Sequence, residues 1–117
     1  MARKGGIRYA VFTWVPEGLL PEWNDWHNNV HIPNVLSAPQ MRGVRKFRVA
    51  DAAFPGDWKP QYVTVYQLDS LEDFEAYRRG PGVLRRRDYD DRYGDVGKVA
   101  RVVLGEEIQL GDSDSPL

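Results

Sequence analysis

Residues 23–33, with the sequence WNDWHNNVHIP, contain two of the four tryptophans and both histidines of the chain. Read as a helix of ~3.6 residues per turn, this region and the residues just before it place four apolar side chains within an arc of roughly 60°. These side chains are Leu19, Trp23, Trp26 and Val30. His27 and His31 flank this stripe on one side, so we expect both imidazoles at the edge of a core, where burial can move their pKa values and a ligand can reach them.

Pro33 should disturb the end of this helix, because proline lacks an N–H group and clashes with the preceding turn. We therefore expect a helix from about Leu20 to Asn29, a kink or stop near Ile32, and a second short helical piece over residues 33–37. His31 would then lie at an irregular helix end, which favours a functional role. The alternative for both histidines is a surface or core-edge position in which the nitrogens bind water or backbone.

The spacing of His27 and His31 also occurs in zinc-binding helices, because residues four apart share a helix face. Here Asn28 stands where a metalloprotease helix carries its general-base glutamate, the chain has no cysteine, and no third ligand is evident nearby. We therefore expect no metal site and no cofactor.

The length, charge and composition of the chain exclude several classes of function. A chain of 117 residues is expected to form one domain over residues 1–117, with residues 1–6 and 111–117 flexible. A net charge of −1 and a pI of about 6.1 argue against nucleic-acid binding. No apolar stretch approaches the ~20 residues that a membrane helix needs, and the lack of cysteine fits a cytoplasmic protein. The densest charged run, residues 85–92, should be a solvated helix or loop with local Arg–Asp pairs, with an anion site as the alternative.

Strand patterns alternate with helical ones along the chain. Runs rich in β-branched and aromatic residues predict strands over residues 7–14, 44–50, 61–68 and 99–104, the last extending as far as Leu110. Ser70 should cap a second helix that ends at Gly80. Phe54 and Trp58, in the loop over residues 51–60, should either cover a pocket mouth or a partner subunit, or fold back on their own core.

This β-α-β-β-α-β order predicts an α+β, ferredoxin-like fold with a four-stranded antiparallel sheet and both helices on one face. The opposite face of such a sheet cannot stay bare if it is apolar. Two chains packed sheet on sheet would bury it, so we expect a homodimer.

The motif Trp23-x-x-Trp26-His27-x-x-x-His31-Ile32-Pro33-x-Val35-Leu36, followed by Pro39 and Gly43-x-Arg45-x-Phe47, is similar to the EthD-like branch of the dimeric α+β barrel superfamily. The resemblance implies a dimeric α+β barrel with a pocket in each subunit between sheet and helices, lined by His31. That superfamily includes cofactorless monooxygenases, muconolactone-type isomerases, dehalogenating enzymes, polyketide cyclases and haem-handling enzymes, so the resemblance is specific for fold rather than activity.

These features predict a small enzyme that performs cofactor-independent acid/base chemistry, of the isomerase, lyase, cyclase or dehalogenase type, on a small aromatic or enolisable substrate. His31 would move the proton, His27 would tune or relay it, and Tyr66 or Arg48 would stabilise an enolate or phenolate. Six aromatic side chains would bind the substrate: Tyr9, Phe12, Trp14, Trp23, Trp26 and Tyr62. The alternatives are a cofactorless monooxygenase acting on a polyphenol-like substrate, a non-enzymatic small-molecule-binding or structural dimer, and haem ligation by either histidine.

Overall fold

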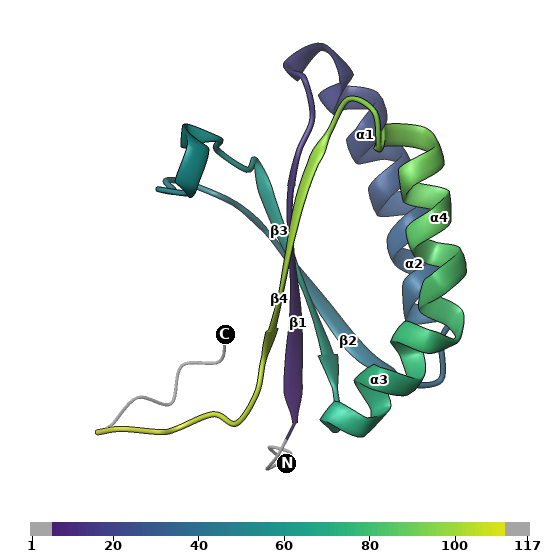
Figure 1. The fold of residues 1–117 in the computed structure, drawn as a ribbon, viewed down its shortest axis with the longest axis vertical. Helices are drawn as coiled ribbons and strands as arrows, with labels where there is room; N and C mark the ends of the chain where they lie inside the picture. The colour runs from purple at the N-terminus through teal and green to yellow at the C-terminus, as the bar shows by residue number, and fades with distance from the viewer. Residues whose placement is uncertain (1–5, 112–117) are drawn as a thin grey trace.

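Four strands form a single antiparallel sheet in the computed structural model, which describes residues 6–111 (Figure 1). The strands are β1 (Ile7–Trp14), β2 (Met41–Arg48), β3 (Tyr62–Leu68) and β4 (Lys98–Leu104). Their order across the sheet is β2-β3-β1-β4, so the first and third strands are central. This is the ferredoxin-like α+β arrangement that the order of elements predicted, and that prediction is confirmed.

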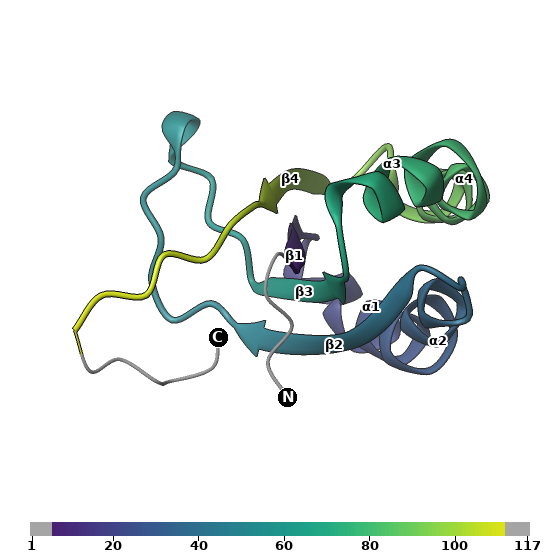
Figure 2. The same ribbon diagram turned by 90° about the horizontal axis from the view of Figure 1, so that it is seen from below.

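The helices all lie on one face of the sheet (Figure 2). Besides two short 3-10 turns at Glu17–Leu19 and Pro55–Asp57, they are α1 (Leu20–Trp26), a π-helical segment (His27–His31), α2 (Ile32–Leu36), α3 (Leu71–Arg79) and α4 (Pro81–Tyr93). Seen from below, α1 and α2 lie on the side of β2, whereas α3 and α4 lie on the side of β4 (Figure 2). The longest of these helices, α4, has 13 residues, and none between residues 6 and 111 could cross a bilayer. The cytoplasmic location expected from the sequence stays a prediction.

Period-two alternation along the strands separates a helix-facing side of the sheet from an open face. On β1, Tyr9 and Thr13 are buried on the helix-facing side, whereas Phe12 and Trp14 point to the open face. Residues that are paired across neighbouring strands lie on the same face, so the register extends these two faces over all four strands. Three exposed apolar side chains belong to the open face: Phe47, Val102 and Leu104.

The predicted helix end at Asn29 was wrong, because helical backbone continues from Leu20 to Leu36. The N–H of Ile32 donates to the carbonyl of His27, five residues back, which is the hydrogen bond of a π turn. This wider turn carries the helix past Pro33, which has no N–H to donate. The extra residue in the turn also moves Val30, expected on the buried stripe, to 45% exposure.

Strand β2 begins three residues earlier than predicted, at Met41, and includes a β-bulge between Met41 and Gly43. The bulge lets this first part of the strand pair despite an irregular register. Strand β4 ends at Leu104 and does not reach Leu110. The expected flexibility concerns residues that, apart from Gly6 and Gly111, lie outside the described range.

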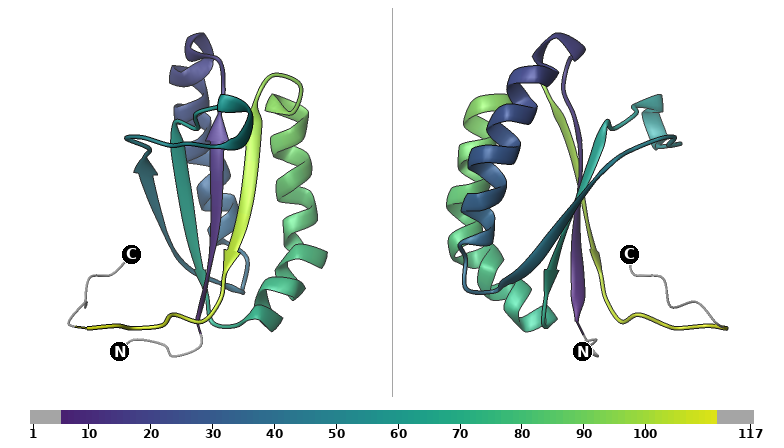
Figure 3. Two further views of the ribbon diagram at one scale, coloured as in Figure 1. Left: turned by 60° about the vertical axis from the view of Figure 1, so that its left-hand side comes forward. Right: turned by 180° about the vertical axis from the view of Figure 1, so that it is seen from behind.

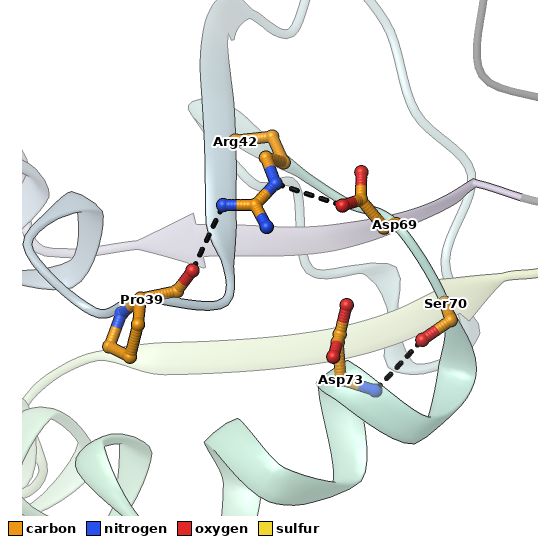
Figure 4. A network of polar contacts seen from close by, with 5 residues as sticks. All are labelled: Pro39, Arg42, Asp69, Ser70 and Asp73. Atoms are coloured by element: carbon orange, nitrogen blue, oxygen red, sulfur yellow. Dashed lines mark hydrogen bonds and ion pairs between the residues drawn. The ribbon is translucent and has the colours of Figure 1, made fainter.

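Polar contacts fix the end of the sheet where β2 starts and α3 begins (Figure 4). Arg42 donates to Asp69 at 2.9 Å and to the carbonyl of Pro39 at 3.0 Å. The hydroxyl of Ser70 accepts a hydrogen bond from the N–H of Asp73 at 3.0 Å, as predicted for a helix cap.

The loop over residues 51–60 projects from the open face of the sheet, away from the helices (Figure 3). The ring of Phe54 lies 5.3 Å from that of Phe12 and 5.1 Å from that of Trp58. The loop aromatics therefore pack on the open face of their own chain and do not cover a pocket beneath the helices.

We expect Ser70→Ala to lower the free energy of unfolding by about 1 kcal/mol, because it leaves the Asp73 N–H without its cap. Urea denaturation followed by circular dichroism measures the change. Ser37→Ala is the matched control, since the Ser37 hydroxyl donates to the carbonyl of Asn34 on an exposed helix end and caps no helix start. An unchanged midpoint in Ser70→Ala would show that the cap contributes nothing to stability.

Candidate functional site

A cavity of about 280 Å³ lies between the helix-facing side of the sheet and the helices. Its lining residues come from β1, β3 and β4 on one side, and from the π segment, α2, α3 and α4 on the other. The volume is near the lower end of the range of about 300–1,000 Å³ typical of ligand sites, so the cavity suits a small molecule.

Both histidines line this cavity and belong to a stack of four aromatic rings. The ring centroids of Trp23 and His27 lie 4.2 Å apart, those of His27 and His31 5.5 Å, and those of His31 and Trp26 4.9 Å. Each pair is inclined by less than 30°. The indole of Trp23 is held in turn by a 3.1 Å hydrogen bond to the hydroxyl of Tyr89 on α4. Stacking therefore fixes both imidazoles against the cavity wall.

Lys46, on β2, determines which nitrogen of His27 carries the proton. The ammonium Nζ lies 3.1 Å from His27 Nδ1, and an ammonium can only donate, so Nδ1 is the acceptor and the proton resides on Nε2. The other two donors of Lys46 meet the side-chain oxygens of Asn24 and Asn28 at 2.9 and 2.6 Å. All three ammonium hydrogens thus have acceptors that hold Lys46 against the imidazole.

The imidazole of His27 is neutral in this environment. Burial, then the charge of Lys46 and then His31 lower its pKa to about 2. Burial also lowers the pKa of Lys46 to about 8, which leaves the ammonium mostly charged near neutral pH. With Nδ1 occupied and Nε2 protonated, His27 is a hydrogen-bond donor and is unsuited to act as a general base.

His31 has a different environment. Its ring packs on Trp26 and meets Tyr89 edge-on, but neither nitrogen has a hydrogen-bond partner within residues 6–111. Burial, followed by the charge of Arg85, lowers its pKa to about 4; Arg101 acts in the same direction and Asp88 opposes it. His31 is therefore unprotonated at neutral pH and can accept a proton from a molecule in the cavity.

Three tyrosines on three elements also present their side chains to the cavity: Tyr9, Tyr66 and Tyr77. None of their hydroxyls has a hydrogen-bond partner in the described part of the chain, although all three residues are largely buried. Burial raises the pKa of Tyr66, and it raises the pKa of Tyr77 to about 12. These two phenols are thus protonated at neutral pH and can donate to a ligand.

Four arginines complete the lining: Arg78 on α3, Arg85 and Arg86 on α4, and Arg101 on β4. The described residues that line the cavity include no aspartate or glutamate. The charged run over residues 85–92 is helical and holds the expected local pair, Arg85 with Asp88 at 3.5 Å. Even so, two of its arginines border the cavity.

The structure brings together four of the ten predicted site residues at the cavity: Tyr9, His27, His31 and Tyr66. Trp23 and Trp26 lie behind the histidines in the stack, and Tyr62 stacks on Trp23 at 5.7 Å. These three support the site from behind and do not line it.

Three predicted residues lie elsewhere and are corrected here. Strand alternation turns Phe12 and Trp14 to the open face, opposite the cavity. Arg48 lies at the end of an edge strand with its guanidinium 5.6 Å from the ring of Tyr62, and it does not line the cavity.

Lys46, Arg78 and Arg101 were not predicted from the sequence as site residues, whereas Arg85 and Arg86 belong to the charged run for which an anion site was the alternative. The sequence pattern could have indicated Arg101, because this residue lies on the same side of β4 as Val99 and Val103, where an apolar residue facing the core would be expected. The pattern could have indicated Lys46 in the same way, because it lies between Val44 and Arg48 on the helix-facing side of β2. Nothing in the sequence pattern indicated Arg78, which lies near the end of α3.

No group of three His, Cys, Asp or Glu side chains arranged to hold a metal ion occurs within residues 6–111. The third ligand that a zinc site at His27 and His31 would need is therefore not supplied by this part of the chain.

Several solved structures share this fold. An EthD family protein from Bacillus halodurans matches with a TM-score of 0.66 and 21% identity, covering 89% of this chain and 99% of its own. A hydroxynitrile lyase from Passiflora edulis matches with a TM-score of 0.68 and 14% identity over 92% and 99% of the two chains. SnoaB, a cofactor-independent oxygenase from Streptomyces nogalater, matches with a TM-score of 0.65 and 12% identity over 92% and 99%. The ferredoxin-like α+β fold predicted for the single chain is confirmed, and these proteins share it.

At the level of sequence, a family model described as "Domain of unknown function (DUF4286)" matches residues 6–106. No curated protein sequence matches the chain.

We expect Lys46→Met to remove the tautomer preference of His27, because only the ammonium forces Nδ1 to accept. Nitrogen-15 NMR of the imidazoles at pH 6.5 should show a protonated Nε2 in the wild type and a mixture of tautomers in the variant. Lys98→Met is the matched control, since Lys98 lies by Trp14 on the open face. A protonated Nε2 retained in Lys46→Met would contradict this role.

Proposed function

The chain belongs to the family described as Domain of unknown function (DUF4286), which assigns no activity, and we propose that it is a small enzyme performing cofactor-independent acid/base chemistry with His31 as the base. The substrate is a small aromatic or enolisable molecule. The observation that carries the proposal is a cavity with aromatic walls in which a neutral, unpartnered imidazole lies among tyrosine hydroxyls that also lack partners within residues 6–111.

The reaction begins with transfer of a proton from a substrate C–H to His31. The C–H bond breaks, its electron pair moves toward the neighbouring carbonyl, and an enolate oxygen forms. That oxygen accepts hydrogen bonds from a tyrosine hydroxyl, such as that of Tyr66, or from His27 Nε2–H. The imidazolium of His31 then returns the proton to another carbon, which completes an isomerisation. In an elimination, the electron pair of the enolate instead forms a C=C bond as the bond from the β-carbon to the leaving group breaks, and the imidazolium gives its proton to that group.

The positive charges around His31 act on both the base and the substrate anion. Burial, and then the charges of Arg85 and Arg101, oppose protonation of His31, so the free imidazole is a weak base that is unprotonated at neutral pH. The same guanidiniums stabilise negative charge that develops on the substrate. The cavity thus favours an enolate through its cations and its neutral donors together.

Proteins with this fold support two related chemistries. One of them is described as a hydroxynitrile lyase, a type of reaction within the first candidate function. Another is described as a cofactor-independent oxygenase, which favours the second candidate function. In that alternative His31 deprotonates a polyphenol-like substrate, whose anion reduces dioxygen directly. Oxygen uptake during turnover separates the two.

We also propose that the protein is a homodimer through the open face of its sheet. Phe47, Val102 and Leu104 are exposed there. The segment over residues 105–111 projects on the same side of the sheet, with Ile108 and Leu110 about three-quarters exposed (Figure 3). A second copy packed sheet on sheet would cover these side chains.

We expect wild-type protein to accelerate deuterium exchange at the α-carbons of 2-tetralone, and His31→Gln to lower that rate by about 10²–10⁴-fold. Proton NMR in deuterated buffer measures the exchange. Because the base must be unprotonated, the wild-type rate should rise with pH through the pKa of His31 at about 4 and stay flat up to neutral pH.

Asn29→Gln is the control for this experiment, because Asn29 is an exposed residue of the same π segment. Full exchange activity in a folded His31→Gln protein would contradict the assignment of the base. Binding of 2-tetralone without accelerated exchange would instead favour a non-enzymatic ligand-binding protein.

We expect Phe47→Glu to shift the protein from dimer to monomer, because a carboxylate at the centre of an apolar interface loses its hydration without a partner. Sedimentation velocity at micromolar concentration measures the change. Leu84→Glu on α4 is the matched control, since Leu84 is also exposed but lies away from the open face. A wild-type chain that sediments as a monomer would rule out this assembly.

A further inference from the structure

Four arginines line one small cavity, and they come from three elements of the fold. Arg78 comes from α3, Arg85 and Arg86 from α4, and Arg101 from β4. These elements lie on the same side of the molecule, where β4 forms an edge of the sheet (Figure 2). Like charges around a cavity repel one another unless water or a group of opposite charge compensates them. Arg78, Arg86 and Arg101 are exposed to water, whereas Arg85 is half-buried.

The described chain compensates only part of this charge. Arg78 pairs with Glu75 at 2.7 Å and Arg85 with Asp88 at 3.5 Å. Neither Arg86 nor Arg101 has a carboxylate within ion-pair distance among residues 6–111. The lining histidines are neutral, and the lining residues in this range include no acidic side chain, so the cavity has a surplus of positive charge.

The rest of the wall is aromatic or aliphatic and contains the unpartnered hydroxyls. Phe74, Val11 and Val35 line it beside the tyrosines. Arg85, Arg101 and His31 line the same cavity, and the charges of the two arginines add to the lowering of the pKa of His31. A ligand that fills about 280 Å³ can therefore touch the guanidiniums with one end and His31 with the other.

We propose that this cavity binds a small carboxylic acid, with its carboxylate on the guanidiniums of Arg85 and Arg101 and its aromatic or enolisable part against His31. Guanidinium groups match the geometry of a carboxylate and bind it with charge-assisted hydrogen bonds. A compact, singly charged group on an apolar body fits a small cavity whose other walls are apolar. The inference rests on the proposed function, because it names the substrate class of the same site.

Binding of such an anion changes the base itself. His31 faces Arg85, Asp88 and Tyr89 of α4, Arg101 of β4, and His27 of its own helix. Burial is the largest cause of the lowered pKa of His31, and the charges of Arg85 and Arg101 add to it. A carboxylate on the two guanidiniums offsets those charges, so it removes that part of the lowering and the pKa rises. The imidazole therefore becomes a stronger base only when a charged substrate is present.

The experiment compares two probes of the same shape, phenylacetate and phenylacetamide, by isothermal titration calorimetry at pH 7. We expect wild-type protein to bind the carboxylate about tenfold more tightly or better, with a preference that falls as salt is added. Arg101→Gln and Arg85→Gln should each reduce this preference while leaving the affinity for phenylacetamide unchanged. Unchanged amide binding also shows that the variants are folded.

Arg87→Gln is the matched control, because Arg87 is the same residue type on the same helix but does not line the cavity. It should keep the full preference for phenylacetate. As a second readout, NMR titration should show the pKa of His31 rising on addition of phenylacetate and unchanged with phenylacetamide.

Equal affinities for the two probes in the wild type, or a preference that survives both arginine variants, would overturn the inference. Tighter binding of phenyl phosphate than of phenylacetate would overturn the choice of a carboxylate. These measurements require no turnover, so they are independent of the proposed function. A carboxylate preference together with full exchange activity in His31→Gln would support the anion site and contradict His31 as the base. Loss of exchange activity in His31→Gln without a carboxylate preference in the wild type would support His31 as the base and contradict the anion site.

Discussion

The π segment from His27 to His31 holds two imidazoles in a stack of aromatic rings between the helices and the sheet, where His27 is buried and His31 is half-buried. Desolvation keeps both rings neutral, and it is the largest cause of the lowered pKa in each. A charged histidine pair in this place would repel the arginines that border the cavity. The neutrality imposed by burial therefore allows imidazoles and guanidiniums to share one small site.

Two identical side chains acquire different properties from their neighbours. Lys46 occupies Nδ1 of His27 and leaves that residue as a donor, whereas His31 has no hydrogen-bond partner among the described residues. The difference comes from β2, which supplies Lys46 to one imidazole only. A donor and an acceptor side by side are what proton transfer to and from a carbonyl compound requires.

The same alternation that builds the site also separates it from the proposed assembly surface. Odd-numbered residues of β1 face the helices and the cavity, and even-numbered residues face away. A substitution on the open face can therefore alter association without touching the cavity. Since this fold supports several chemistries, the function must be argued from the residues of the cavity and not from the fold.

Local sequence determined much of this architecture. The bounds of β1, the alternation along β3 and the cap at Ser70 all follow from side-chain type and spacing, because these features depend on contacts within a few residues. The order of elements then gave the sheet, and the motif around His31 placed the histidines on the correct helix. The pattern could not reveal the π turn, because it depends on how the backbone passes Pro33 while Trp23 and Trp26 stay buried. Nor could it reveal that Arg85 and Arg101, sixteen positions apart, meet at one cavity beside His31, because only the packing of α4 over the edge of the sheet brings them together.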